Sequence, residues 1–150
     1  MKKDKKYPKK QKNKSKKPVQ KAGLAVKNEF YLEASWILSS MIEKKLKKIL
    51  EKIENRSTVA GYSLEQSVKR IKHFHITAKQ PLFSEHFEMR LIDEIRNWKN
   101  QRNTILKDMQ DIHVSQARLE RLALEGIRLL KEWNKASKKF KTEKAFSTAP

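Results

Sequence analysis

Apolar residues recur at helical spacing along most of the chain between residues 28 and 138. From Asn28 to Asn55 they return every three to five positions, which predicts one long amphipathic helix. The segment ENRSTVAGYS then breaks the pattern, so the helix is expected to end there. The members of its apolar stripe are Phe30, Ala34, Ile37, Leu38, Met41, Ile42, Leu46, Ile49, Leu50 and Ile53.

Serines stand where three further helices are expected to begin. Ser63, with Gln66 three residues later, matches a capping box, and Ser84 and Ser115 are the other two expected caps. The three helices are predicted to span residues 64–77, 84–109 and 116–138. Four helices with short connections predict an all-α fold, an antiparallel four-helix bundle. We place this bundle at residues 22–141, between a tail at 1–21 and a frayed end at 142–150.

The tail at residues 1–21 is rich in lysine and almost free of apolar residues, so we expect it to be disordered. As a polycation it could hold phosphate backbones without sequence preference, and the alternative is a solubilising leader. The lysines assigned to non-specific nucleic-acid binding are Lys2, Lys3, Lys5, Lys6, Lys9, Lys10, Lys12, Lys14, Lys16 and Lys17.

The charge balance extends the polyanion argument to the whole chain. There are 36 Lys and Arg against 17 Asp and Glu, a net charge of +19, which favours nucleic acid or an anionic membrane surface. The alternative is a merely soluble, lysine-rich protein. No stretch approaches the roughly 20 apolar residues of a membrane span, so we expect a cytoplasmic protein without membrane insertion. A basic first helix lying on a membrane is a further alternative, although its polar face mixes Glu with Lys.

Metal and cofactor chemistry find little support in the sequence. The chain has no cysteine, which excludes disulfides, zinc ribbons and thiol chemistry. Its four histidines lack the spacing of a metal motif, so no metal and no cofactor are expected. Three tryptophans fall on three different predicted helices, and we expect core packing or groove filling, with base stacking as the alternative. They are Trp36, Trp98 and Trp133.

An arginine interrupts the apolar stripe of the third predicted helix. Arg102 stands where the spacing calls for an apolar residue, and burying an unpaired guanidinium is costly. Three partners are conceivable: a carboxylate on the first helix such as Glu33 or Glu43, a second subunit, or a phosphate. Asn103 and Lys107 lie beside Arg102 and would complete a phosphate-binding group.

The sequence around Arg102 resembles the HEPN superfamily of small helical proteins. The stretches that carry the likeness are WKNQRNTILKDM, EASWILSSMIEKKLKKILEKI and LALEGIRLLKEWNKASKKFK, within residues 28–141. The family motif is an Arg followed after four to six residues by His, often written RNxxxH. Carried over, Arg102 matches the motif Arg and Asn103 its polar follower, and the motif His falls at Lys107.

This resemblance implies RNA binding and a homodimer whose two motifs face each other. Active members are metal-independent ribonucleases, often toxins or phage-defence components. A lysine is a poor general base beside a histidine, so Lys107 in the histidine position argues against efficient cleavage. On a straight helix Arg102 and Lys107 also point about 140° apart, so sharing a site requires a distortion or a dimer cleft.

The sequence therefore predicts a HEPN-like RNA-binding protein, with a degenerate or weak metal-independent endoribonuclease of a toxin–antitoxin or phage-defence type as one form of it. The alternative is a non-catalytic, antitoxin-like regulatory partner protein in which Arg102 makes an internal salt bridge. A third hypothesis is an architectural factor that binds nucleic acid only through its basic tail.

Overall fold

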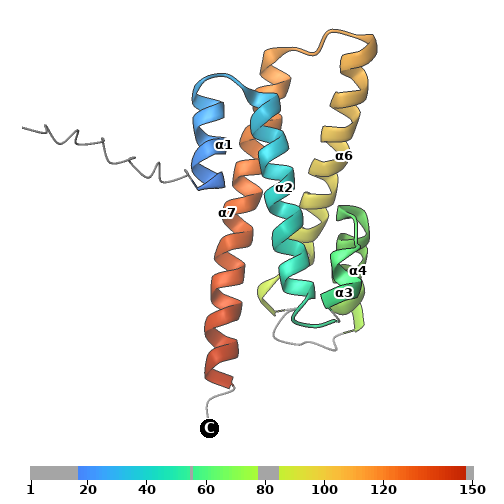
Figure 1. Ribbon diagram of the computed structural model, residues 1–150, viewed down its shortest axis with the longest axis vertical. Coiled ribbons are helices and arrows are strands. Elements are labelled where there is room, and N and C mark those ends of the chain that lie inside the picture. The colour runs from blue at the N-terminus through green and yellow to red at the C-terminus, as the bar shows by residue number, and fades with distance from the viewer. Residues whose placement is uncertain (1–16, 55, 78–84, 148–150) are drawn as a thin grey trace, which may run out of the picture.

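The computed structural model describes residues 17–54, 56–77 and 85–147, and every regular element there is a helix (Figure 1). The prediction of an all-helical chain is confirmed for these residues. Most of the predicted tail, the expected cap Ser84 and residues 148–150 lie outside the described part. The helices are α1 Pro18–Lys27, α2 Tyr31–Leu50, α3 Arg56–Ala60, α4 Leu64–Thr77, α6 Met89–Asp111 and α7 Gln116–Ser147.

Two predicted caps are present. The backbone N–H of Gln66 donates to Ser63 Oγ at 3.2 Å, and the N–H of Ser63 donates to Gln66 Oε1 at 2.8 Å, which completes the capping box of α4. Ser115 Oγ accepts the N–H of Arg118 at 3.2 Å and caps α7. The capping signals in the sequence therefore placed the beginnings of both helices correctly.

The ends of the chain are more helical than expected. Helix α1 begins at Pro18, inside the segment predicted as tail, because proline is well suited to the first helical position. It was missed because it buries little besides Ala22 and Ala25 among lysines and polar residues. Glu29, with a positive φ of 63°, separates α1 from α2. Helix α7 continues to Ser147, through part of the segment expected to fray.

Ion pairs between helices show how the helices run. Along each pair of neighbours the residue numbers rise on one helix and fall on the other, so α6 is antiparallel to both α4 and α7. Helices α2, α4 and α7 all run the same way (Figure 1). The antiparallel four-helix bundle is therefore not confirmed, because α2, α4 and α7 are parallel to one another. The pairs are Glu65–Lys99 and Lys72–Asp93 for α4 and α6, and Glu94–Arg128 and Asp108–Arg118 for α6 and α7.

A close contact between helices lies at the centre of the core. Trp98 of α6 is buried, and its Nε1–H donates to the carbonyl of Leu122 on α7 at 2.8 Å. Gly126 of α7 makes room for it: a Cβ there would lie 2.7 Å from Trp98 Cζ2 and 3.1 Å from Leu38 Cδ1 of α2. Gly126 therefore sets the spacing of α2, α6 and α7 at this level.

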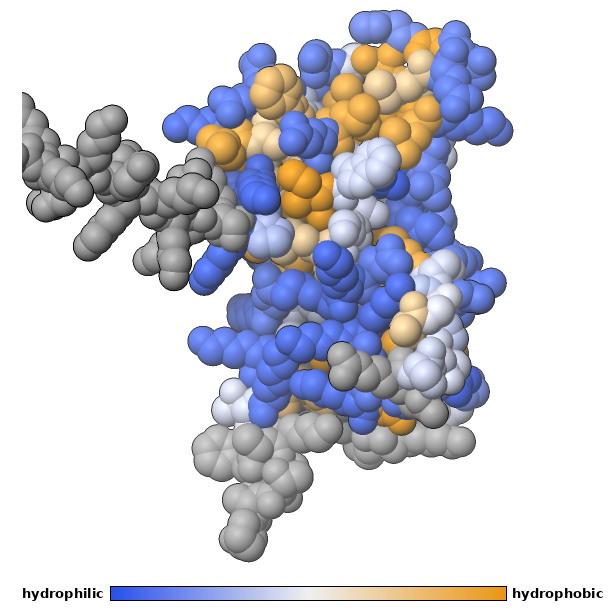
Figure 2. All heavy atoms as spheres, viewed as in Figure 1, coloured by the Kyte–Doolittle hydropathy of each residue, from blue (hydrophilic) through white to orange (hydrophobic). Residues whose placement is uncertain are grey.

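Two short helices each cover only part of α2. Helix α1 packs along its first turns, where Ala25 and Ala34 share a small buried cluster, and α4 packs along its later turns (Figure 1). Helix α4 does not reach the first turns of α2, which are therefore open on the side that faces α6. Helix α1 does not reach the later turns of α2, which are therefore open on the side next to α7. Figure 2 shows apolar surface at the first of these places and hydrophilic surface around the lower part of the molecule.

Candidate nucleic-acid interface

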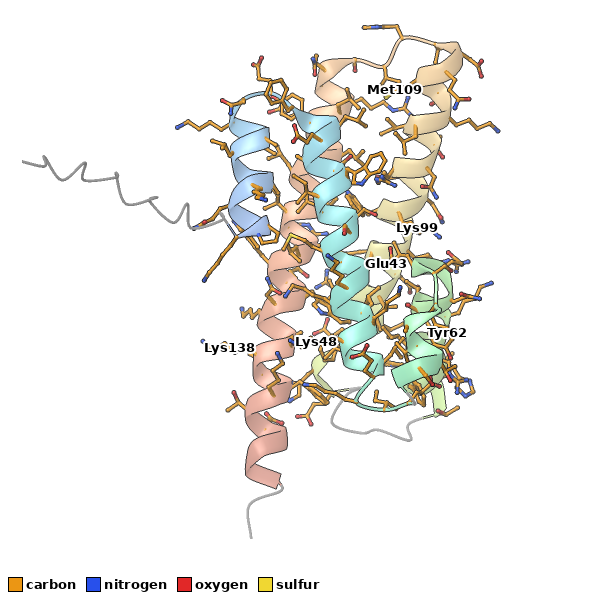
Figure 3. All side chains as sticks on the ribbon, viewed as in Figure 1. Glu43, Lys48, Tyr62, Lys99, Met109 and Lys138 are labelled. Carbon is orange, nitrogen blue, oxygen red and sulfur yellow. The ribbon has the colours of Figure 1, made fainter. Side chains whose placement is uncertain are left out.

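Arg102 lies on α6 between Lys99 and Met109, and it faces Trp36 in the first turns of α2. Leu106 and Met109 follow it on the same side of α6 at helical spacing, and Met109 is 42% exposed (Figure 3). The guanidinium Cζ of Arg102 lies 5.8 Å from the centre of the Trp36 ring of α2, a cation–π contact. The stripe of α6 thus contains an arginine at the point where α4 no longer covers it.

The surroundings of Arg102 leave its charge without an anionic partner. Among the described residues no carboxylate is ion-paired with Arg102, and its buried Nε has no hydrogen-bond partner. Burial lowers the pKa of the Arg102 guanidinium, because desolvation disfavours the charged form. Neither acidic partner considered from the sequence contacts it: Glu33 is exposed, and Glu43 is paired with Lys47 at 3.1 Å.

Asn103 and Lys107 do not join Arg102 in one site of a single chain. Both side chains are exposed, and α6 runs as an unbroken α-helix through all three residues. Helical geometry turns Asn103 about 100° and Lys107 about 140° away from Arg102. The local distortion that would bring Arg102 and Lys107 together is absent from α6.

Trp36 is the site residue that sequence reasoning placed incorrectly. Trp98 and Trp133 are buried as expected, with 1% and 2% of their surface exposed, but Trp36 is 66% exposed. A signal was present in the sequence, because Trp36 falls outside the apolar stripe of α2 that includes Ala34 and Leu38. A large aromatic residue off the stripe is exposed unless another element covers it, and α4 does not reach it.

Arg128 on α7 shows what a paired arginine in this protein looks like. Its Nη2 lies 2.6 Å from Glu94 and 2.5 Å from Glu125, and its Nη1 lies 2.5 Å from Glu132. Hydrogen bonds to Glu125 and Glu94 raise the pKa of Arg128, whereas burial alone lowers that of Arg102. The unpaired state of Arg102 is therefore specific to its position and does not hold for arginine in this fold generally.

A groove lies beside Arg128, between α6 and α7. It has a volume of about 1030 Å³ and is lined mainly by amide and arginine side chains over an apolar floor that includes Ile105 and Leu122. Two of its arginines are already paired with carboxylates, Arg118 with Asp108 and Arg128 with Glu94. The groove therefore offers less free positive charge than its composition implies.

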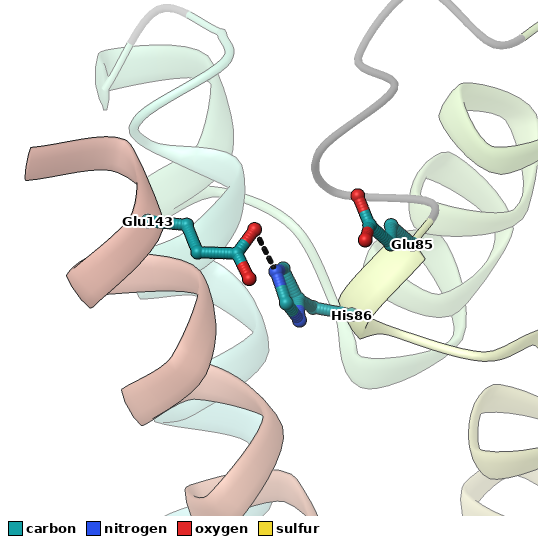
Figure 4. A group of neighbouring side chains, drawn as sticks. All are labelled: Glu85, His86 and Glu143. Atoms are coloured by element: carbon teal, nitrogen blue, oxygen red, sulfur yellow. Dashed lines mark ion pairs between the residues drawn. The ribbon is translucent and has the colours of Figure 1, made fainter. Parts of the chain in front are cut away.

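One group of described side chains has the ligand types that a metal ion requires (Figure 4). Glu85, His86 and Glu143 place one ligand atom each within 4.8 Å of one another. His86 Nε2 lies 2.7 Å from Glu143 Oε2, and the His86 side chain is only 9% exposed. Both carboxylates are exposed, and the contact between His86 and Glu143 joins α7 to the segment before α6.

Comparison with known proteins gives no relative from which to transfer a role. The chain matches no family model, no curated protein and no solved structure. In the part of the chain that the structure describes, no helix combines the length and apolarity that crossing a membrane requires. The function has to be inferred from the geometry of Trp36 and Arg102 and from the charge of the chain.

Proposed function

We propose that this protein binds single-stranded RNA through Trp36 and Arg102. The observation that supports the proposal is the half-buried arginine without a carboxylate partner, held against an exposed tryptophan. An unstacked base can lie on the open face of Trp36, and base stacking on an aromatic side chain contributes about 1–3 kcal/mol. The guanidinium of Arg102 can then donate to a neighbouring phosphate.

RNA is the nucleic acid we favour because of the resemblance to the HEPN superfamily, whose motif Arg falls at Arg102. The net charge of +19 adds long-range attraction for any polyanion. We do not propose efficient cleavage. General base catalysis needs a group that can accept a proton, and α6 contains no histidine, while Lys107 points away from Arg102. A homodimer, in which Lys107 of a second copy approaches Arg102, belongs to the same proposal.

A fluorescence titration tests this proposal directly. Trp36 is the exposed member of the three tryptophans, so binding of a short single-stranded RNA should quench mainly its emission. We expect Trp36→Ala to weaken RNA binding by about 5- to 150-fold, which corresponds to the loss of about 1–3 kcal/mol of stacking. Arg102→Ala should weaken binding by a similar factor, because its phosphate contact is charge-assisted.

Matched controls separate this site from general surface effects. Ile76→Ala removes another exposed apolar side chain, 74% exposed on α4, and Arg121→Ala removes an exposed arginine of α7. Both controls should bind RNA like the wild type. Equal affinities for Arg102→Ala and Arg121→Ala would show that Arg102 is not a site residue. If Arg102→Ala changed only the association state of the protein, the partner of this surface would be protein, as the antitoxin-like alternative requires.

RNA cleavage is a separate readout of the same proposal. Wild-type protein should leave a labelled RNA intact in the presence of a chelator. Lys107→His supplies the histidine that the family motif calls for, yet within one chain it would still point about 140° from Arg102. Cleavage by Lys107→His would therefore indicate a composite site formed by two subunits, and sedimentation of the same sample would show the dimer.

A further inference from the structure

Four lysines line the surface of α2 and α7 below the end of α1. Lys45 and Lys48 lie three residues apart on α2, and Lys138 and Lys141 lie three apart on α7, so each pair occupies one side of its helix. Figure 3 shows Lys48 and Lys138 on the same side of the molecule, in the half that α1 does not reach. We call these four residues the lysine face.

No carboxylate of the described residues is ion-paired with any lysine of this face. Other lysines in the structure are paired, for example Lys47 with Glu43 and Lys72 with Asp93. Glu143, two residues after Lys141, contacts His86 instead. The positive charge of this face is therefore not neutralised within the chain.

The lysines are close enough to repel one another. Burial lowers the pKa of Lys45 most, and the charges of Lys141 and Lys48 lower it further. Lys45 is half-buried on α2 and Lys141 belongs to α7, so this repulsion acts between the two helices. A polyanion on the surface would relieve the repulsion and would gain from all four ammonium groups at once.

An anionic membrane and a nucleic-acid backbone could each supply the negative charge, and the side chains around the lysine face favour the nucleic acid. A helix that lies in a membrane interface inserts large apolar side chains beside its lysines. The large exposed apolar residues of the described part lie elsewhere, and none belongs to the lysine-face segments of α2 and α7: Val19, Leu24, Phe30, Trp36, Ile76, Met109, Ile112 and Leu124. A nucleic-acid backbone needs only positive charge and donors, which the lysine face provides.

We infer that the lysine face is a second nucleic-acid contact that holds the phosphate backbone without reading its sequence. The inference rests on the proposed RNA-binding function, and it assigns the two surfaces different roles. Trp36 and Arg102 hold a base and its phosphate, while Lys45, Lys48, Lys138 and Lys141 contact phosphates elsewhere along the strand. Since phosphate is common to RNA and DNA, the lysine face binds either.

The salt dependence of binding tests the lysine face. The full-length double variant Lys48→Gln with Lys141→Gln is compared with Lys27→Gln with Lys69→Gln, which removes the same charge from α1 and α4. Binding of a fluorescent single-stranded RNA is measured over a range of salt concentrations. The lysine-face variant should reduce the slope of log K against log salt by about 1.4, since each lost phosphate contact contributes about 0.7 for a single strand. The control should keep the wild-type slope.

Three outcomes would overturn the inference. One is a slope for the lysine-face variant that equals the control, with both variants folded by circular dichroism. The second is a loss confined to RNA, with the DNA strand of the same sequence unaffected, because a backbone contact does not distinguish them. The third is loss of binding to phosphatidylserine vesicles while the nucleic-acid slope is unchanged, which would assign the face to a membrane.

The same titration separates this inference from the proposed function. Trp36→Ala should lower the affinity by a similar factor at every salt concentration, because stacking releases no counterions. If Trp36→Ala has no effect and the lysine-face variant still changes the slope, the proposed site fails and the lysine face stands. If only Trp36→Ala has an effect, the proposed site stands and the lysine face fails.

Discussion

The two open surfaces of this protein arise from one cause and differ in chemistry. Both exist because a short helix covers only part of α2: α4 leaves the first turns open toward α6, and α1 leaves the later turns open beside α7 (Figure 1). The first surface contains one arginine and an exposed tryptophan, and the second contains four lysines without carboxylate partners in the described chain. Coverage decides where a surface is available, and the side chains at the uncovered positions decide what it can bind.

The two surfaces also differ in how far the fold removes their charges from water. Arg102 is half-buried against an aromatic ring, so its charge is desolvated by the fold itself. In the lysine face only Lys45 is half-buried, while Lys48, Lys138 and Lys141 stay exposed. A single desolvated cation suits a specific contact, and a group of hydrated cations suits long-range, salt-sensitive attraction.

The largest effect should come from Gly126, which sets the spacing of the helices that carry both surfaces. Gly126→Ala places a Cβ 2.7 Å from Trp98 Cζ2, and Trp98 is held by its hydrogen bond to Leu122. We expect the free energy of unfolding to fall by about 1–3 kcal/mol, as for other overpacked cores, in urea denaturation.

Gly23→Ala is the matched control for that substitution. Gly23 lies inside α1 with nothing within 4 Å of its would-be Cβ, so alanine should stabilise the protein by about 0.5–1 kcal/mol. If both substitutions shifted stability in the same direction, close packing at Gly126 would not set the helix spacing.

A smaller effect should sharpen the account of Arg102. Arg102→Met keeps an unbranched apolar stem and removes a desolvated charge that has no carboxylate partner, so the free energy of unfolding should rise by about 1 kcal/mol. RNA affinity should fall in the same variant, measured by the titration described above. Destabilisation by Arg102→Met would mean that the arginine has a stabilising partner, and the contrast with Arg128 would then disappear.

The smallest effect on stability should come from the ion pair between Glu94 and Arg128. This pair is the reference for the cations of the two open surfaces, which have no carboxylate partner among the described residues. Hydrogen bonding to Arg128 holds the pKa of Glu94 below its ordinary value of 4.5. A depressed carboxyl pKa stabilises the fold above the unfolded-state pKa, and this contribution is lost as the pH falls through the folded-state pKa.

Glu94→Gln removes that contribution. At neutral pH the variant should be less stable than the wild type by a few tenths to about 1 kcal/mol, because the pair is partly exposed. The difference should shrink as the pH falls below about 4.5, in urea denaturation followed at several pH values. A difference that stayed constant with pH would rule out the ion pair as its cause.

Local signals in the chain were enough to predict α4 and the beginnings of α4 and α7. The periodicity of apolar residues predicted α4 and the start of α7, and Ser63 and Ser115 capped them as expected, because a cap depends only on residues within one turn. Arg102 also stood out from the sequence alone, since one cation in an apolar stripe is visible without a structure. Helix α1 was not predicted, because its buried face consists mainly of two alanines and gives too weak an apolar periodicity among the lysines.

Tertiary packing decided which parts of those helices are covered. Periodicity identifies the side of a helix that can be buried, but whether a neighbour reaches each turn depends on the lengths and directions of the other helices. For that reason the chain pattern could not show that Trp36 is exposed or that Arg102 lies against it instead of against Glu33 or Glu43. The meeting of lysines from α2 and α7, more than 90 residues apart for Lys45 and Lys141, likewise follows only from the parallel packing of two distant segments.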